Sequence, residues 1–278
     1  MNYLILFFSA SLDVAQTVLT KKASTRADTK FMLSFNFFKS VGAFIILLLL
    51  LGGKIAVNFP TVIFGTVYGL LLLSSMCTSF IALKLGNMAL TAIIISYSVI
   101  IPFLFGGIVL HEPIGLLQIG GLILMLLSIV LMNYRKSGEG FGKKWALLTF
   151  SCFVTNGLCS VVQKLHQTTY PGQYQKEFMT VAFGMIALVL ITILLIKHKS
   201  VETNSNKIAA ASGACTGVAY LLTLSLSSVL NATVLFPTLA VCGAVLNCVV
   251  SRLIFKDKLR KLQLVAVAIG IVSIVLIQ

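Results

Sequence analysis

The chain is a succession of ten apolar segments, each about as long as a bilayer is thick. A helix that crosses the hydrocarbon core needs about 20 mostly apolar residues, and segments of that kind follow one another here with only short connections. They lie near residues 2–20, 31–52, 61–83, 87–109, 115–133, 144–163, 176–196, 207–228, 231–255 and 261–277. This pattern leaves no room for a soluble domain. It predicts an all-α integral membrane protein with ten transmembrane helices, of which the first is retained rather than cleaved.

Charged residues make up only 10% of the 278 residues, whereas 58% are hydrophobic. Soluble domains carry about 25% charged residues, so this composition is typical of a membrane protein. The net charge of +14 comes mostly from basic residues in short connections, where they favour anionic lipid headgroups over nucleic acid as partners. Connections after odd-numbered segments hold 17 Lys and Arg, against 3 on the other side. Because short basic loops stay cytoplasmic, we expect both termini outside.

Weak internal matches follow one another in the same order along the two halves of the chain. The tetrapeptide Ser-Ile-Val-Leu at residues 128–131 recurs at residues 273–276, and the same kind of alignment places Asn156 opposite Asp13. This order predicts two five-helix repeats, residues 1–135 and 143–278. Because five is odd, the second repeat would enter the membrane inverted. Inverted repeats characterise secondary transporters, with the substrate near the midplane and alternating access between the halves.

Glycine steps and prolines inside the apolar segments predict where helices pack closely and where they bend. Gly-x-x-x-Gly steps let helix backbones approach one another in lipid, and static packing is the favoured interpretation of the two steps here. A proline in mid-span frees a backbone carbonyl, so each one indicates a kink or a hinge. The residues concerned are Gly65, Gly69, Gly213, Gly217, Pro102 and Pro237.

Asp13 lies deep inside the first apolar segment. A charge at the centre of a membrane helix costs roughly 2.5–3.5 kcal/mol on insertion scales, so such a residue usually faces a cavity or a partner. Lys39 in the second segment is as far from the middle of the connection as Asp13 is, and the two could face each other. Asp13 is then either a structural ion pair or a group that binds protons and substrate. Lys39 alternatively extends to the cytoplasmic surface.

Other polar side chains within the spans are weaker candidates for the same cavity. Tyr97 and Tyr220 fall near mid-depth, where a ring face attracts organic cations by roughly 0.5–2 kcal/mol, although packing explains them as well. Asn156 could hydrogen-bond substrate without titrating, and Asn247 is a further candidate. Two acidic residues at span ends, Glu112 and Asp257, are interpreted as structural caps or gate contacts.

Several kinds of chemistry lack a motif in this sequence. The six cysteines lie within apolar segments without metal-ligand spacing, and the three histidines lie in connections or at helix ends. No Gly-x-x-x-x-Gly-Lys-Ser/Thr pattern for a nucleotide phosphate occurs. We therefore predict no catalytic residue, no metal, no cofactor and no enzymatic activity.

The chain resembles the drug/metabolite transporter superfamily, in its ten-helix EamA-type branch. The stretch from Ala82 through Glu112 to Gly121 resembles the family pattern in which an acidic residue ends the fourth helix. Residues 253–263, with Asp257 at the acidic position, resemble the second copy of that pattern. The resemblance implies an integral carrier of the bacterial inner membrane for amino acids, other metabolites or organic cations, often an exporter.

Two basic positions extend this resemblance. Lys39 matches a basic position that the family often carries in its second helix. Asp13 lies eight residues before Lys21, as in the small multidrug resistance branch, where such a carboxylate binds protons and cationic drugs.

We therefore predict a secondary active transporter that exports a small amino acid-like metabolite or an organic cation by alternating access, with proton coupling. Its partners would be the substrate, protons and membrane lipids, and it would act as a monomer or homodimer. Within transport, a facilitative uniporter or an exchanger is the alternative. Outside transport, the alternatives are a membrane scaffold or receptor and an enzyme acting on a lipid carrier.

Overall fold

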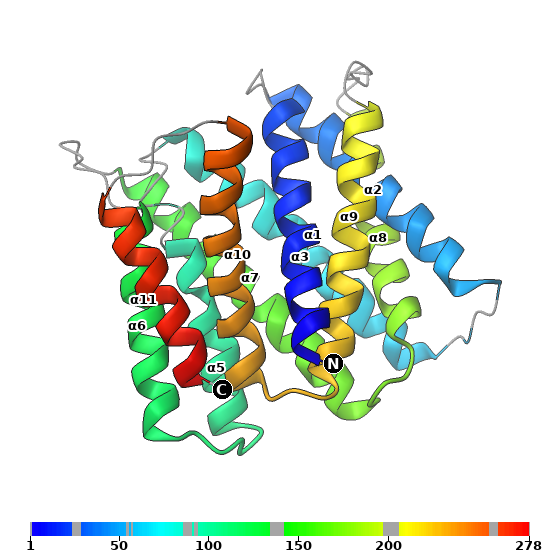
Figure 1. Cartoon of the computed structure of the whole chain (residues 1–278). Coiled ribbons are helices and arrows are strands. Elements are labelled where there is room, and N and C mark those ends of the chain that lie inside the picture. The colour runs from blue at the N-terminus through cyan, green and yellow to red at the C-terminus, as the bar shows by residue number, and fades with distance from the viewer. Residues whose placement is uncertain are drawn as a thin grey trace. The chain divides into compact units, whose positions relative to one another are not determined.

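The computed structural model describes residues 2–23, 29–53, 56, 58–85, 91, 94–133, 142–196, 206–255 and 261–277. These residues form ten α-helices and one 3-10 turn, and no strand occurs among them (Figure 1). The elements are α1 (Asn2–Ala23), α2 (Thr29–Leu51), α3 (Phe59–Leu85), η1 (Tyr97–Val99), α5 (Ile100–Ile108), α6 (Leu116–Asn133), α7 (Lys143–Thr169), α8 (Gln175–Ile196), α9 (Asn206–Ser227), α10 (Ala232–Phe255) and α11 (Lys261–Ile277).

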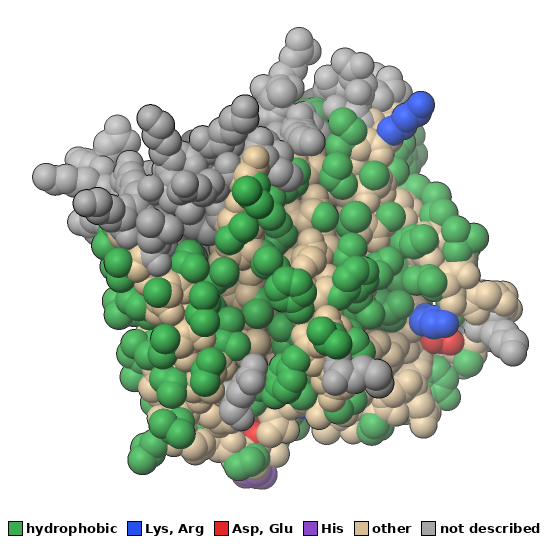
Figure 2. Space-filling view, viewed as in Figure 1, with side chains coloured by type: hydrophobic (Ala, Val, Ile, Leu, Met, Phe, Trp, Pro, Cys, Tyr) green, Lys and Arg blue, Asp and Glu red, His purple; other side chains and the backbone are tan. Residues whose placement is uncertain are grey.

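The helices follow the predicted apolar segments closely. Six of the described helices, α1, α2, α3, α7, α8 and α9, are long and apolar enough to cross a membrane, and four shorter apolar helices accompany them. Among the side chains that Figure 2 colours as hydrophobic, basic, acidic or histidine, most are hydrophobic and few are charged. Helices suit this setting because all their backbone polar groups are paired within the segment, where lipid offers no hydrogen bonds.

The fourth segment, expected as one span over residues 87–109, contains an irregular turn. Its described residues are helical at Thr91 and over Ile94–Ile108, and a 3-10 turn at Tyr97–Val99 interrupts the α-helix, which resumes at Ile100. Residues 87–90 and 92–93 of that span lie outside the described part. Pro102 stands in the first turn of α5. Because proline has no N–H and clashes with the carbonyl four residues earlier, the α-helical pattern is interrupted at Ser98. By contrast, α10 continues through Pro237.

The first of two compact units comprises residues 1–70 and 166–228. Within it α9 packs against α1 and α2, and α8 packs against α2 and α9. Gly213 of α9 lies so close to the Lys39 carbonyl that a Cβ would clash, and Gly217 lies against Ala43. On α3, a Cβ at Gly69 would lie 2.7 Å from the Ala182 carbonyl oxygen of α8. Small residues therefore set the helix spacing in this unit.

The second compact unit comprises residues 71–165 and 229–278. Its main contacts pair α6 with α11 and α5 with α10, and α10 also packs against α11. The Ser128 hydroxyl of α6 donates to the Ala266 carbonyl of α11 across 2.7 Å, and Gly121 packs directly on the backbone of α11 at Ser273 and Ile277.

Each compact unit takes helices from both halves of the sequence. The first unit joins α1 and α2 to α8 and α9, and the second joins α5 and α6 to α10 and α11. The units are thus not the predicted repeats, residues 1–135 and 143–278, which stay a prediction from the sequence.

Candidate functional site

Asp13 and Lys39 lie near each other in the first unit, and the side chain of Gln16 connects them. The Lys39 ammonium donates to Gln16 Oε1 across 2.7 Å. Gln16 Nε2 in turn donates to Asp13 Oδ1 across 3.2 Å. All three side chains are half-buried. The three side chains form a hydrogen-bonded row, called here the polar chain, in which the amide stands between the carboxylate and the ammonium.

Helix α9 fixes the backbones of α1 and α2 on both sides of this polar chain. The Ser212 hydroxyl of α9 donates to the Gln16 carbonyl across 3.2 Å and lies 3.3 Å from the hydroxyl of Thr20. The next residue, Gly213, packs directly on the Lys39 carbonyl. Two adjacent small residues of α9 therefore hold α1 and α2 at the spacing that Gln16 spans.

The sequence suggested the Asp13–Lys39 neighbourhood but not the residue between them. Gln16 follows Asp13 by three positions, and residues three apart share one face of a helix, so this spacing was the available signal. The Lys39 side chain points toward Gln16 of α1. The side chain of Lys21, the second half of the spacing of eight, is not among those described.

The other predicted residues are divided between the two units. Tyr220 of α9 lies in the first unit, with its ring centroid 6.1 Å from that of Phe183. Three others lie in the second unit. Asn156 of α7 donates to the Ser98 hydroxyl across 2.7 Å, the Tyr97 hydroxyl donates to the Leu126 carbonyl across 3.3 Å, and Asn247 is half-buried on α10. Asp13 and Lys39 are thus the predicted pair that the structure brings together.

A second charged cluster surrounds Glu112 in the second unit. Its two carboxylate oxygens accept the backbone N–H groups of Ala232 and Thr233, at 2.9 and 3.0 Å, and so cap the N-terminus of α10. The Lys164 ammonium lies 3.1 Å from Glu112 Oε1 and donates to the Leu230 carbonyl across 2.7 Å. The Lys164 and Glu112 side chains are only 10% and 8% exposed. Capping was one of the two roles suggested for Glu112, whereas Asp257, its predicted counterpart, lies outside the described residues.

The surroundings of Glu112 favour its charged form. Burial by itself would raise the pKa of this carboxyl, but the N–H groups of Ala232 and Thr233 and the ammonium of Lys164 outweigh it. The pKa of Glu112 is therefore held below its ordinary value. A carboxylate at a helix N-terminus is also stabilised by the helix dipole, so this cluster is suited to holding structure in place.

His166 forms a third polar cluster, inside the first unit, and its side chain is fully buried. Gln167 Oε1 accepts the N–H of Gly172, which orients the amide so that its Nε2 donates to His166 Nδ1 across 2.9 Å. His166 Nε2 then carries the proton and donates to the Thr61 hydroxyl across 3.1 Å. Both ring nitrogens are occupied within the protein, and the ring packs 4.7 Å from that of Phe178. His166 is a structural residue here.

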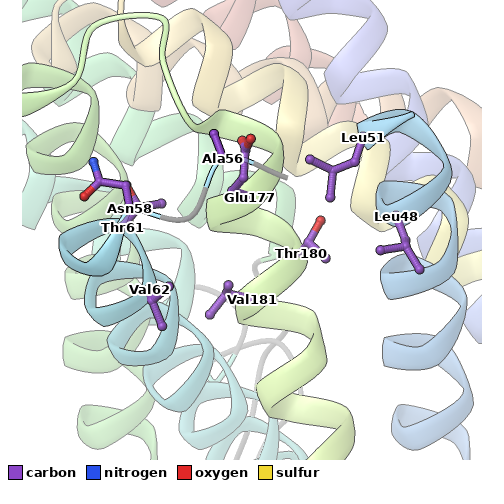
Figure 3. Close-up of a pocket in the computed structure, with 9 residues that line it drawn as sticks. All are labelled: Leu48, Leu51, Ala56, Asn58, Thr61, Val62, Glu177, Thr180 and Val181. Carbon is purple, nitrogen blue, oxygen red and sulfur yellow. The ribbon is translucent and has the colours of Figure 1, made fainter. Parts of the chain in front are cut away.

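A small pocket of about 130 Å³ lies in the first unit, at the end of α2 and the beginnings of α3 and α8 (Figure 3). Its wall is mostly apolar, and the polar residues among those that line it are Asn58, Thr61, Glu177 and Thr180. The lining residues are Leu48, Leu51, Ala56, Asn58, Thr61, Val62, Glu177, Thr180 and Val181. None of the residues predicted to bind substrate lines it, so it is separate from the Asp13 chain. Within the described part of the protein, no group of three or more His, Cys, Asp and Glu could hold a metal ion.

Comparisons with known proteins agree with this architecture. A model of the EamA-like transporter family matches residues 1–134. A search of curated proteins finds no match. A solved structure titled "Crystal structure of protein" matches with a TM-score of 0.76, covering 99% of this chain and 97% of the other at 16% sequence identity. At that identity, the likeness shows a shared fold alone.

Proposed function

We propose, from the premise that the chain belongs through residues 1–134 to the EamA-like transporter family, that it is a secondary active exporter. Its substrate would be a small amino acid-like metabolite or an organic cation, moved by alternating access with proton coupling. Membership in this family and the apolar helices already make it a multi-pass membrane protein with a role in transport. The finer parts of the proposal depend on the polar chain of Asp13, Gln16 and Lys39.

The observation that carries the proposal is an ionic site built inside apolar helices. Asp13 and Lys39 stand on segments that are long and apolar enough to span a membrane, where ionisable side chains commonly mark substrate or proton paths. Separated opposite charges suit a zwitterion, whose ammonium would bind Asp13 and whose carboxylate would bind Lys39. Asp13 would accept a proton in one state and release it in the other, because only differential affinity for two states drives a conformational change.

Glycine packing in the first unit supports the pair of repeats that alternating access needs. Gly213 and Gly217 of α9 follow Gly65 and Gly69 of α3 by 148 residues in both cases. The pairs also contact equivalent residues: Gly213 and Gly217 lie on Lys39 and Ala43, whereas Gly65 and Gly69 lie on Phe178 and Ala182, which are 139 residues later in both cases. The α9–α2 and α3–α8 contacts are thus related by one exchange of the two halves, as expected of a duplicated bundle.

The same alignment favours a site with charges on one side only. Phe178, which corresponds to Lys39 in this exchange, is fully buried beside the ring of His166. Asn156, which corresponds to Asp13 in the predicted repeat, donates to a serine hydroxyl. The ionic chemistry would therefore belong to the first half, and the amide of Asn156 would offer at most a neutral contact.

A transport screen with matched compounds tests this function. Purified protein in proteoliposomes would be offered radiolabelled amino acids, the amines that lack their carboxylate, and the carboxylic acids that lack their ammonium. We expect the wild type to prefer zwitterions, Asp13→Asn to lose discrimination for the ammonium and Lys39→Met to lose it for the carboxylate. Ser11→Ala is the control, since this serine bonds within its own helix to the Phe7 carbonyl. Flux that is equal in all four proteins would contradict the proposed site.

The proposal also places the protein in the bacterial inner membrane with both termini on the outside. The excess of basic residues in the connections after odd-numbered segments supports termini on the outside of the bacterial inner membrane. A reporter fused after Gln278 would then be found outside, and a cytoplasmic reporter would reverse the orientation.

A further inference from the structure

The side chain of Gln16 reaches both charges. Its Oε1 accepts from Lys39, and its Nε2 donates to Asp13. The polarity of the amide matches the order of the charges, because the oxygen faces the ammonium and the nitrogen faces the carboxylate. Gln16 Nε2 also lies 3.3 Å from the hydroxyl of Thr17, which gives the amide a second acceptor.

The backbone at Gln16 is fixed independently of its side chain. The hydroxyls of Ser212 and Thr20 both donate to the Gln16 carbonyl, at 3.2 and 2.8 Å. These bonds are made to the backbone and do not involve the Gln16 side chain. A change at Gln16 therefore alters the spacing of the charges while leaving the helix contacts in place.

We propose that Gln16 is a spacer that prevents Asp13 and Lys39 from closing into a direct ion pair. This inference rests on the proposed function of the Asp13 site and assigns its positioning residue. A direct, partly buried ion pair is hard to open, because separating it leaves two uncompensated charges. Hydrogen bonds through a neutral amide exchange more easily. By holding the ammonium one amide away, Gln16 leaves the second oxygen of Asp13 open to a proton or to a substrate ammonium.

Described charged side chains lie on two helices next to Asp13. Helix α1 packs against α9, and Lys39 of α2 reaches α1 through Gln16. Among the side chains described on α2 and α9, the charged ones are Lys39 and Lys207, and Lys207 is exposed in the first turn of α9. Of these two ammonium groups, Lys39 is the one that the Gln16 amide links to Asp13.

Dicyclohexylcarbodiimide reports the protonation of such a carboxyl directly. This apolar reagent takes up the carboxyl proton while the carboxylate oxygen adds to its central carbon, and the resulting O-acylisourea rearranges to a stable N-acylurea. Modification of Asp13 in the purified full-length protein would be followed by mass spectrometry over a series of pH values, with Asp13→Asn as the blank. The pH midpoint of modification then measures how strongly the neighbours favour the carboxylate.

Two substitutions at Gln16 separate spacing from mere packing. Gln16→Ala opens a path for the flexible Lys39 side chain, so we expect the midpoint to move toward acid by roughly one pH unit or more. Gln16→Leu keeps the volume that holds Lys39 away and removes the amide, so no acid shift is expected. In Gln16→Ala combined with Lys39→Met, the acid shift should disappear, because the ammonium is absent.

Several results would overturn the spacer. An unchanged or alkaline midpoint in Gln16→Ala would do so, and so would an equal acid shift in Gln16→Leu. The spacer would also be contradicted if the carbodiimide modified Asp13 neither in the wild type nor in Lys39→Met, because loss of the ammonium must make Asp13 easier to protonate. If Asp13→Asn abolishes proton-driven transport while Gln16→Ala keeps the wild-type midpoint, the spacer fails and the proposed function stands. If proton-driven transport survives in Asp13→Asn while the pH midpoint of Gln16→Ala is shifted toward acid, the proposed function fails and the spacer stands.

Discussion

Two carboxylates inside this protein are stabilised in different ways. Glu112 accepts two backbone N–H groups and the ammonium of Lys164, so all its strong partners belong to the fold. Asp13 accepts a hydrogen bond from the Gln16 amide, and this amide lies between Asp13 and the ammonium of Lys39. At the scale of residues, the first arrangement is suited to holding helices, and the second is suited to exchanging partners.

The Glu112–Lys164 pair should contribute strongly to stability. Removing one partner of a mostly buried pair leaves an uncompensated charge, so Glu112→Gln and Lys164→Met should each lower the free energy of unfolding by roughly 3 kcal/mol. The double variant should lose less than the two single losses combined. Unfolding in mixed detergent micelles measures all three. Lys143→Met is the control, because Lys143 is an exposed lysine at the start of α7, the helix that also carries Lys164. If Lys164→Met lowered the free energy of unfolding no more than Lys143→Met does, the result would contradict a stabilising Glu112–Lys164 pair.

Stability should also depend on pH through Glu112. The pKa of this carboxyl in the folded protein lies below its ordinary value of 4.5. Its stabilising contribution is therefore complete above the unfolded-state pKa, and it is lost as the pH falls toward and through the lower folded-state pKa. We expect the free energy of unfolding of the wild type to fall over this acidic range, and Glu112→Gln to show a flatter profile there. Identical profiles would show that the carboxyl contributes nothing.

At the scale of elements, helix contacts depend on which face carries the small residues. The neighbours Gly120 and Gly121 of α6 show this clearly. A Cβ at Gly121 would lie 3.0 Å from the Ser273 carbonyl oxygen of α11, whereas a Cβ at Gly120 would meet nothing within 4 Å. One face of α6 is thus set for contact with α11, and the adjacent position is open.

Alanine substitution of these two glycines provides a matched test of that contact. Gly121→Ala forces the α11 backbone to move and should destabilise the protein by about 1–3 kcal/mol, as overpacking commonly does. Gly120→Ala adds the same methyl group in open space and should be neutral or slightly stabilising, since alanine favours helix more than glycine does. Thermal unfolding in detergent distinguishes them, and equal effects would refute the packing argument.

The sequence predicted the helices well, because a run of about 20 apolar residues is a strong and local signal. Pro102 marked an irregularity in the fourth segment, but a local pattern does not say that the turn before it becomes 3-10. The Asp13 and Lys39 neighbourhood followed from equal depth along a hairpin. Gln16 was missed because its role depends on the rotamer of its side chain and on the contact with Ser212 of α9, which lies 196 residues later in the chain. Such partners are set by tertiary packing and have no local signal.

At the scale of the whole molecule, the chain passes between the two compact units three times. One passage lies within α3, one near the end of α7 and one in the connection from α9 to α10. Lys164 and Leu230 lie in sequence beside the second and third passages. The Lys164 ammonium donates a hydrogen bond to the Leu230 carbonyl and forms an ion pair with Glu112. The grouping of helices from both sequence halves into each unit could not be predicted, because it depends on which apolar faces meet.

The central claim is that Asp13 couples the movement of a proton to that of substrate. The most direct measurement is uptake of the substrate found in the screen into proteoliposomes with an imposed pH gradient, in wild type and in Asp13→Asn. We predict that the wild type concentrates substrate and that collapsing the gradient with a protonophore abolishes this. Asp13→Asn should equilibrate substrate without concentrating it. Accumulation by Asp13→Asn that depends on the gradient as strongly as in the wild type would contradict the account.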